Sequence, residues 1–307
     1  MNNSPKKTPG GVKKAAVVDA MKQLLSDPTA KIKLDDFVTS HVKRFIEETN
    51  IEHFPVQASS VSKEDFLERL GKYEEATREI SDIVILLAYW GDQTQLSLLE
   101  KIFKRISETD KGSSGTVLWL KLGWYPLMLL MYVAGIAALS KKRFDVLKIV
   151  LETEIRITHK YDGKGVPLVL PVFSSITDLH DNFKLIPGRE RNHTPRSEHL
   201  LQLLQPQLED LLFLGQGYEM LFDEFEVFIA LVYADFASGD WGPPGRFAWK
   251  YSNPISADNP FRELMEKAKK AADTWEPLRK GFFGGSYKRF EEISGIYQKQ
   301  LDQLHWW

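Results

Sequence analysis

The uncharged segment LGWYPLMLLMYVAGIAALS, residues 122–140, constrains the fold of this chain more than any other stretch. It runs for nineteen residues without a charge, close to the length of a membrane-spanning helix, and charged residues flank it at 121 and 141–143. Pro126 suits the first turn of a helix. A helix starting there has about fourteen uncharged residues, which suits a buried core helix better than a membrane span. We therefore expect a core helix, and membrane association through 122–140 is kept as an alternative.

The residues after this segment predict a second helix, so 125–152 together have the pattern of a helical hairpin. Small side chains between 134 and 138 allow the two helices to approach closely. The turn KKRFD joins them, and we expect Asp145 to cap the second helix.

Most of the remaining chain also shows helical periodicity. Ser62 and Asp65 have the spacing of a capping box. Apolar residues then recur in steps of four and three from Phe66 to Leu87, which predicts a long helix ending near Trp90. Further helices are predicted over 12–25, 34–49, 96–106, 197–214, 218–236, 260–273 and 286–305. The predicted fold is all-α, an irregular array of helical hairpins with one extended Pro-rich connector.

That connector is GKGVPLVLPVFSS, residues 163–175, where Pro167 and Pro171 are expected to exclude a helix interior. The predicted organisation is a disordered tail (1–11), an N-terminal helical part (12–156), an irregular connector (157–196) and a C-terminal helical part (197–307). One continuous domain over both helical parts is the alternative.

Composition excludes several classes of protein. The chain has 307 residues, of which 43% are hydrophobic, which is enough to bury a large core. With 40 basic and 42 acidic side chains, the net charge gives no support for a nucleic-acid partner, although a local site stays open. Cysteine is absent, which removes thiolate chemistry and fits a reducing compartment. The basic N-terminus lacks the apolar run of a secretory signal, so a cytoplasmic location is expected.

Histidines and arginines gather in the predicted connector. Four of the seven histidines lie within residues 159–199, beside Arg189, Arg191 and Arg196. Imidazoles beside arginines can bind phosphate or perform acid–base chemistry on it. No His-Glu-x-x-His, phosphate-loop or nucleophile-elbow pattern accompanies them, so a solvated loop is the preferred interpretation. If the stretch is catalytic, its candidate residues are Asp178, His180, Asp181, Arg189 and His193.

A second group of residues lies nearer the C-terminus. Glu219, Asp223 and Glu226 share one face of the 218–236 helix, and GDWGPPGRFAWK follows at 239–250. In that loop the prolines stiffen the backbone, the glycines permit tight turns, and Arg246 lies between Trp241 and Trp249. We expect Arg246 and neighbouring lysines to pair with the three carboxylates, with Arg246 stacked on an aromatic ring, and the loop to be locked onto the core. Ligand binding by these six residues is the alternative.

Three segments carry a resemblance to a known class of proteins: WYPLMLLMYVAGIAALSKKRFDVLKIVLE, LFDEFEVFIALVYADF and WGPPGRFAWK. Over most of residues 60–300 the chain resembles helical regions found downstream of effector modules in bacterial anti-phage defence proteins. Those effectors are SIR2-like, nuclease or nucleotide-hydrolysing domains. The resemblance implies a region that senses, binds or oligomerises. No effector module is present in this sequence, so no catalytic residues are implied.

The function expected from the sequence is that of a non-catalytic interaction, sensor or regulatory protein in bacterial defence, with a protein partner or a second copy of the chain. No cofactor and no metal are expected. The alternatives are an enzyme acting on nucleic acid or nucleotide through residues 178–199, and a membrane-associated protein.

Overall fold

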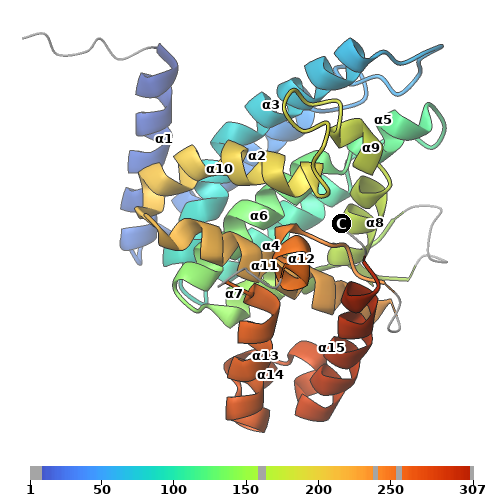
Figure 1. The fold of residues 1–307 in the computed structure, drawn as a ribbon. Coiled ribbons are helices and arrows are strands. Elements are labelled where there is room, and N and C mark those ends of the chain that lie inside the picture. The colour runs from blue at the N-terminus through green and yellow to red at the C-terminus, as the bar shows by residue number, and fades with distance from the viewer. Residues whose placement is uncertain (1–8, 158–163, 238–240, 254–257, 305–307) are drawn as a thin grey trace, which may run out of the picture.

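The computed structural model describes residues 9–157, 164–237, 241–253 and 258–304. These ranges are predominantly helical, with two short strands, so the all-α prediction is confirmed (Figure 1). The first half contains α1 (Pro9–Ser26), α2 (Lys31–Glu48), α3 (Lys63–Trp90), α4 (Leu96–Ser107), α5 (Val117–Leu122), α6 (Tyr125–Ser140) and α7 (Phe144–Glu152). The second half contains α8 (Val169–Thr177), α9 (His180–Phe183), α10 (Pro195–Leu212), α11 (Gly217–Phe236), α12 (Arg246–Ser252), α13 (Pro260–Ala271), α14 (Glu276–Arg279) and α15 (Tyr287–Asp302).

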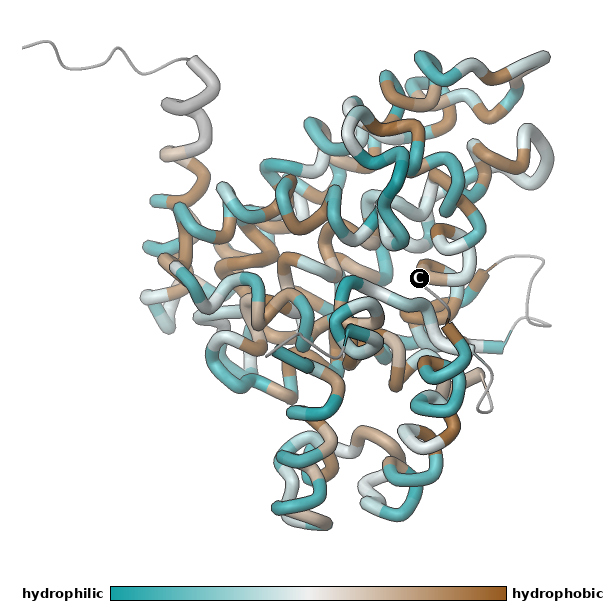
Figure 2. Tube along the Cα trace, viewed as in Figure 1, coloured by the Kyte–Doolittle hydropathy of each residue, from teal (hydrophilic) through white to brown (hydrophobic). Residues whose placement is uncertain are grey.

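Helix α6 lies at the centre of the fold, as its uncharged sequence predicts. Every residue from Tyr125 to Leu139 is buried, and the helix packs against α3, α7 and α11. In the described part of the chain, one helical stretch, Val117–Ser140, is long and apolar enough to cross a membrane, but 94% of its most apolar window is buried inside the fold. In Figure 2 this helix belongs to the hydrophobic, brown part of the trace in the interior of the fold. The expected core helix is therefore confirmed.

Helix α3 is the longest helix and packs most extensively on α6. It begins with the predicted capping box, in which the Ser62 hydroxyl accepts from the backbone N–H of Asp65 and the Asp65 carboxylate accepts from the N–H of Ser62. It ends at Trp90, as the periodicity indicates.

One sequence prediction about the connector is wrong. Among residues 164–175, Val166–Pro167 is extended; it forms strand β2 and pairs antiparallel with β1, Glu154–Ile155. Val169–Thr177 is instead helix α8, and the short helix α9 follows it. Pro171 is tolerated because it lies in the first turn of α8, where its missing N–H would have no helical acceptor.

Two smaller expectations also fail. Asp145 does not cap α7; it lies in the first turn and accepts a hydrogen bond from Gln93, 2.6 Å away. Residues 9–11 of the expected disordered tail belong to α1, and residues 1–8 lie outside the described residues.

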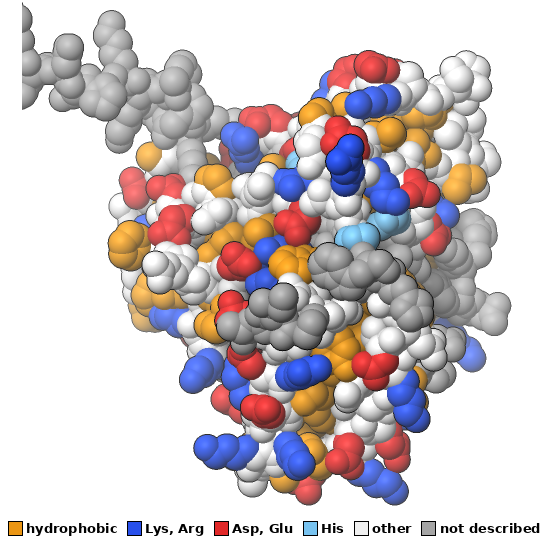
Figure 3. Space-filling model, viewed as in Figure 1, with side chains coloured by type: hydrophobic (Ala, Val, Ile, Leu, Met, Phe, Trp, Pro, Cys, Tyr) orange, Lys and Arg blue, Asp and Glu red, His pale blue; other side chains and the backbone are white. Residues whose placement is uncertain are grey.

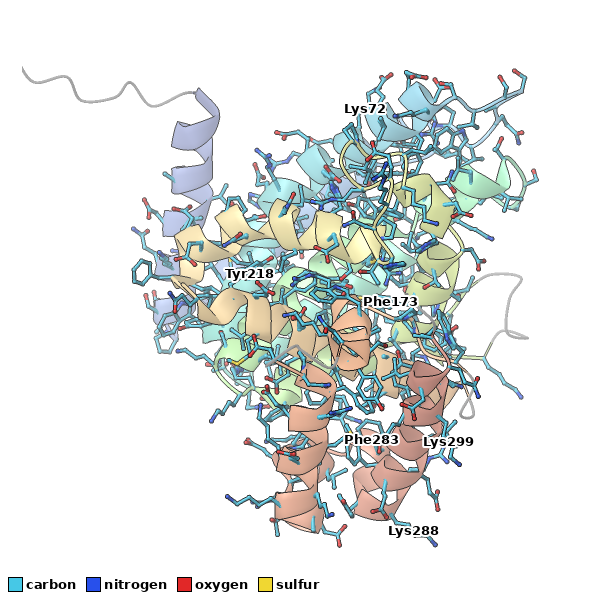
Figure 4. The ribbon with its side chains drawn as sticks, in the orientation of Figure 1. Lys72, Phe173, Tyr218, Phe283, Lys288 and Lys299 are labelled. Atoms are coloured by element: carbon cyan, nitrogen blue, oxygen red, sulfur yellow. The ribbon has the colours of Figure 1, made fainter. Side chains whose placement is uncertain are left out.

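The buried apolar residues of both predicted helical parts form one cluster that extends from Val17 to Leu301. Helices α6 and α11 join the two parts. The lower layer in Figure 4 is the pair α13 and α15, with Phe283 buried between them and Lys288 and Lys299 exposed on α15. The connector therefore separates the two parts in sequence but not in the core.

Close contact between α6 and α11 generates a prediction about Gly135. A Cβ atom at this position would lie 2.0 Å from the ring of Phe225. Because both helices are buried, the ring has no free space to move into, so Gly135→Ala should lower the free energy of unfolding by about 1–3 kcal/mol. Urea denaturation measures this loss.

The matched control is Gly71→Ala in α3, where an added Cβ meets nothing within 4 Å. Alanine has the higher helix propensity, so this variant should gain about 0.5–1 kcal/mol. Equal effects of the two substitutions would contradict the close packing of α6 on α11.

Candidate functional site

Three helices meet around Arg246. The start of α10, the first half of α11 and the start of α12 each contribute polar side chains there. Arg246 is only 6% exposed. Its guanidinium donates to Glu198 at 3.1 Å, to Glu219 at 2.9 Å and to Asp223 at 3.3 Å. All the donor-bearing nitrogens of the guanidinium are therefore engaged by carboxylates.

Lys250 lies one turn further along α12 and reinforces this arrangement. Its ammonium donates to Asp223 at 2.6 Å and to Glu219 at 2.8 Å. Asp223 is fully buried. Burial raises the pKa of Asp223, and the charges of Arg246 and Lys250 oppose this rise. The pKa of Glu219 is lowered, chiefly by its hydrogen bond from Lys250. Burial alone would lower the pKa of Arg246, but Asp223 and the other carboxylates raise it. Arg246 and Lys250 thus stay charged.

The expected pairing of Arg246 with the acidic face is confirmed for Glu219 and Asp223, but Glu226 binds differently. Its carboxylate accepts from the Tyr132 hydroxyl at 2.8 Å, from the Ser197 hydroxyl at 2.6 Å, and from the backbone N–H of Arg246 at 2.7 Å. Burial is the main cause that raises the pKa of Glu226 to about 7, and the bond from Ser197 opposes it.

The expected stacking of Arg246 on an aromatic ring is not found. No cation–π contact of Arg246 occurs among the residues described. Trp249 acts through its indole N–H, which donates to the same Glu198 carboxylate at 3.3 Å. Trp241 lies apart from this network.

The glycines of WGPPGR serve close approach rather than tight turns. Neither Gly242 nor Gly245 has a positive φ. A Cβ at Gly245 would lie 2.1 Å from the Glu226 carboxylate, and one at Gly242 would lie 2.4 Å from the carbonyl oxygen of Ala230. The missing side chains let residues 241–245 lie directly on α11, which brings Arg246 to its carboxylates.

A pocket of about 500 Å³ opens beside this network, on the other side of the start of α10. Its wall comes from α8 and α9, from the loop before α10, from the first turn of α10, and from the segment before α12. Its lining includes the charged or ionisable residues His180, Lys184, Glu190, Arg191, His193 and Arg196. On the face in Figure 3, histidine side chains lie beside basic ones.

Arg196 is the buried cation of this pocket, 8% exposed. Unlike Arg246, it forms no ion pair within the described part of the chain, and its Nε has no hydrogen-bond partner there. Its terminal nitrogens make long contacts, 3.3 Å to the Thr177 hydroxyl and 3.5 Å to the carbonyl of Pro244. Its charge also acts on the Tyr132 hydroxyl and on the Glu226 carboxylate, and it lowers the pKa of both groups against the effect of burial. The ring of Phe173, labelled in Figure 4, lies 6.0 Å from the guanidinium carbon. A buried guanidinium with so few partners is costly.

The first turn of α10 adds further unused donors to the pocket. Thr194 is the N-cap residue, yet its side chain makes no capping bond, and its buried hydroxyl has no partner among the described residues. The backbone N–H groups of Arg196 and Ser197 have no carbonyl within the helix to bond to. The positive end of the α10 dipole therefore lies at the pocket.

The surroundings of His180 in the pocket lower the pKa of its imidazole. Burial lowers the pKa of His180, and Lys184, Arg196 and His193 lower it further, while Asp181 opposes them. His180 is accordingly neutral near pH 7. An anion in this pocket would meet fixed positive charge and unused N–H and O–H donors.

The structure brings together only two of the five catalytic candidates. His180 and His193 line the pocket. Asp178 pairs with Lys121 at 2.7 Å, Asp181 pairs with Lys184 at 3.1 Å, and Arg189 donates to Gln202. Asp178 and Asp181 therefore do not line the pocket, and Glu190 is the carboxylate residue among its described lining.

Sequence reasoning missed the residues that distinguish the two sites. Arg196 was noted only as part of a basic run, and Thr194, Ser197 and Glu198 were not singled out. The signal that could have found them is Thr-Pro-x-Ser at 194–197, a helix start with Pro at the first position. In the described residues, no group of three His, Asp or Glu side chains is arranged to hold a metal ion.

Comparison with family models, with curated proteins and with solved structures finds no match for this chain. The geometry of the two neighbouring sites is therefore the basis for any statement about function.

Replacement of Arg246 tests the buried network. Arg246→Ala leaves Asp223 fully buried with Lys250 as its remaining cation, and it leaves Glu198 without its charged donor. Breaking a buried pair in this way should lower the free energy of unfolding by about 3–5 kcal/mol. Arg246→Lys should recover only part of the loss, because lysine cannot contact three carboxylates in a fixed plane.

The control is Arg105→Ala, which removes an exposed arginine paired with Glu108 at 3.0 Å. That loss should be less than about 1 kcal/mol. If Arg246→Ala unfolds at the same urea concentration as Arg105→Ala, the network does not hold α12 in place.

The raised pKa of Glu226 predicts a pH dependence with a definite sign. The folded state holds the Glu226 proton up to about pH 7, whereas the unfolded chain releases it near 4.5. Between these values the folded state binds more protons, so this residue's contribution to stability falls as pH rises, by up to about 1.4 kcal/mol per pH unit. Above both pKa values the contribution is constant.

Glu226→Gln provides the reference because glutamine does not titrate. Urea denaturation from about pH 5 to about pH 8 should show the wild type losing stability relative to Glu226→Gln as pH rises. A difference between the two proteins that is independent of pH would exclude the proposed protonation of Glu226.

Proposed function

We propose that this protein is a non-catalytic recognition protein that binds an anionic ligand in the pocket at the start of α10. The observation that carries the proposal is Arg196, a buried arginine in the pocket wall with no carboxylate in ion-pair contact and an unbonded Nε among the described residues. Burying an unpaired charge is expensive unless something compensates it. A bound anion would supply that compensation.

The surroundings favour a phosphate-like group in particular. Arginine presents a planar fork of donors that matches phosphate oxygens. The N-terminus of a long helix adds N–H groups and a positive dipole end, a recurring anion site in proteins. Thr194 supplies a hydroxyl. These groups are fixed in place before the ligand arrives, which reduces the cost of binding.

The Arg246 network supports this function without contacting the ligand. Ser197 joins the two sites, because it lines the pocket and its hydroxyl donates to Glu226 while accepting from the N–H of Arg246 at 3.0 Å. A ligand that moves the start of α10 would therefore also alter the hydrogen bonds that Ser197 makes to α11 and α12. Such a connection suits a sensor, whose ligand must alter the rest of the molecule.

The biological part of the proposal follows the resemblance of the sequence. A sensing component in bacterial anti-phage defence, located in the cytoplasm and acting on a protein partner or a second copy of itself, is the role that we propose for this binding activity.

One observation favours a second candidate, an enzyme acting on nucleotides or nucleic acid. His180 and His193 line the same pocket as Arg196, and a neutral imidazole such as His180 can accept a proton. Against it, Asp178 and Asp181 are paired with lysines at the exposed edge.

Calorimetric titration with inorganic phosphate and pyrophosphate tests the proposal. The wild type should bind at least one of them, and Arg196→Gln should weaken binding about tenfold to a hundredfold, the loss expected for a charged hydrogen bond. Arg105→Gln, far from the pocket, should leave the affinity unchanged. Equal affinity of wild type and Arg196→Gln, or no binding to either anion, would overturn the proposed site.

The same preparation separates a binding protein from an enzyme. Release of phosphate from nucleotides or cleavage of RNA or DNA, lost in His180→Ala or His193→Ala, would establish the second candidate. We expect no turnover, and we expect both histidine variants to retain phosphate binding through Arg196.

A further inference from the structure

The lining of the pocket at the start of α10 divides into two halves by side-chain chemistry. Arg196, Lys184, Arg191 and the helix N-terminus form the cationic half, and Glu190 adds one carboxylate. The apolar half consists of Ile176, Trp241, Pro244 and Leu304, and the Pro244 carbonyl lies 3.5 Å from the Arg196 guanidinium. A simple anion such as phosphate would use only the first half. The second half requires a ligand with an apolar or planar part.

Trp241 is the distinctive residue of the apolar half. Its side chain is 41% exposed, although it lines the pocket. It makes no ring stacking, cation–π contact or hydrogen bond with any residue that the structure describes. The other described tryptophans all have such a partner: Trp90 contacts Tyr89 and Lys141, Trp119 contacts Arg69, Trp124 contacts Lys111, Trp249 contacts Glu198, and Trp275 contacts Phe228 and Phe290.

The backbone around Trp241 holds the ring at the pocket. Pro244 follows in the same wall, and Gly242 lies directly against the Ala230 carbonyl of α11. The contact of Gly242 with α11 and the fixed φ of the two prolines place the indole at the pocket. A partly exposed indole can stack on a planar ring.

We infer that the ligand is a nucleotide, with its phosphate on Arg196 and the first turn of α10 and its base against Trp241. This inference rests on the proposed anion-binding function and names its ligand class. The pocket volume of about 500 Å³ lies within the range of small-molecule sites. Asn192 also lines the pocket, and its carboxamide can both donate to and accept from the edge of a base. The nearly neutral net charge favours a free nucleotide over a long nucleic acid.

Calorimetric titration of the wild type with AMP, UMP, ribose 5-phosphate and inorganic phosphate tests the base half of the site. Stacking of a base on an aromatic side chain should make at least one nucleotide bind about tenfold more tightly than ribose 5-phosphate. Trp241→Ala should reduce the nucleotide affinity to that of ribose 5-phosphate and leave the affinity for ribose 5-phosphate unchanged. Trp241→Phe should retain most of the preference, and Trp90→Ala should retain all of it.

The outcomes separate this inference from the function on which it rests. Arg196-dependent phosphate binding without any preference for nucleotides would overturn the nucleotide assignment and leave the anion site in place. Loss of all binding in Trp241→Ala, with Trp241→Phe equally impaired, would show that Trp241 shapes the pocket rather than stacking on a base. A 5′-phosphorylated oligonucleotide that binds more tightly than either mononucleotide would overturn the assignment to a free nucleotide.

Discussion

The ion pairs of Arg246 and Lys250 with the fully buried Asp223 are the interaction on which the arrangement of the second half depends. A buried carboxylate without cations would be strongly destabilising, so α12 must dock on α11 once these residues leave water. Docking draws in residues 241–245, which the missing Cβ atoms of Gly242 and Gly245 permit. Pro244 and Trp241 then stand opposite the start of α10, and this placement creates the pocket.

The two buried arginines near α10 illustrate how environment decides the role of a residue. Arg246 contacts three carboxylates, so its positive charge is compensated by negative charges within the protein. Arg196 directly precedes Ser197, which donates to Glu226, but it has no carboxylate within ion-pair distance among the described residues. The satisfied arginine holds the structure, and the unsatisfied one is available to a ligand. Both are needed, because the first positions the wall that encloses the second.

The sequence predicted the helices well where periodicity and end signals agreed. The uncharged run around α6 and the capping box of Ser62 each indicated a single helix position. The pairing of Arg246 with Glu219 and Asp223 followed from the helical spacing of the two carboxylates. Prediction failed where tertiary contacts decide. Pro171 indicated an extended segment, but its position in the first turn of α8 makes it compatible with a helix. Arg196 looked like one of several loop arginines, because neither its burial nor its lack of a carboxylate can be read from neighbouring residues.

The central claim, that Arg196 is free for a ligand while Arg246 is committed to the fold, is tested most directly by NMR of the arginine side chains. The Nε–H resonances of the two residues can be assigned with Arg196→Lys and Arg246→Lys and followed during titration with inorganic phosphate. We predict a saturable shift of the Arg196 resonance, while that of Arg246 stays in place because Glu198 already accepts from it. Movement of the Arg246 resonance with Arg196 unchanged would contradict the account.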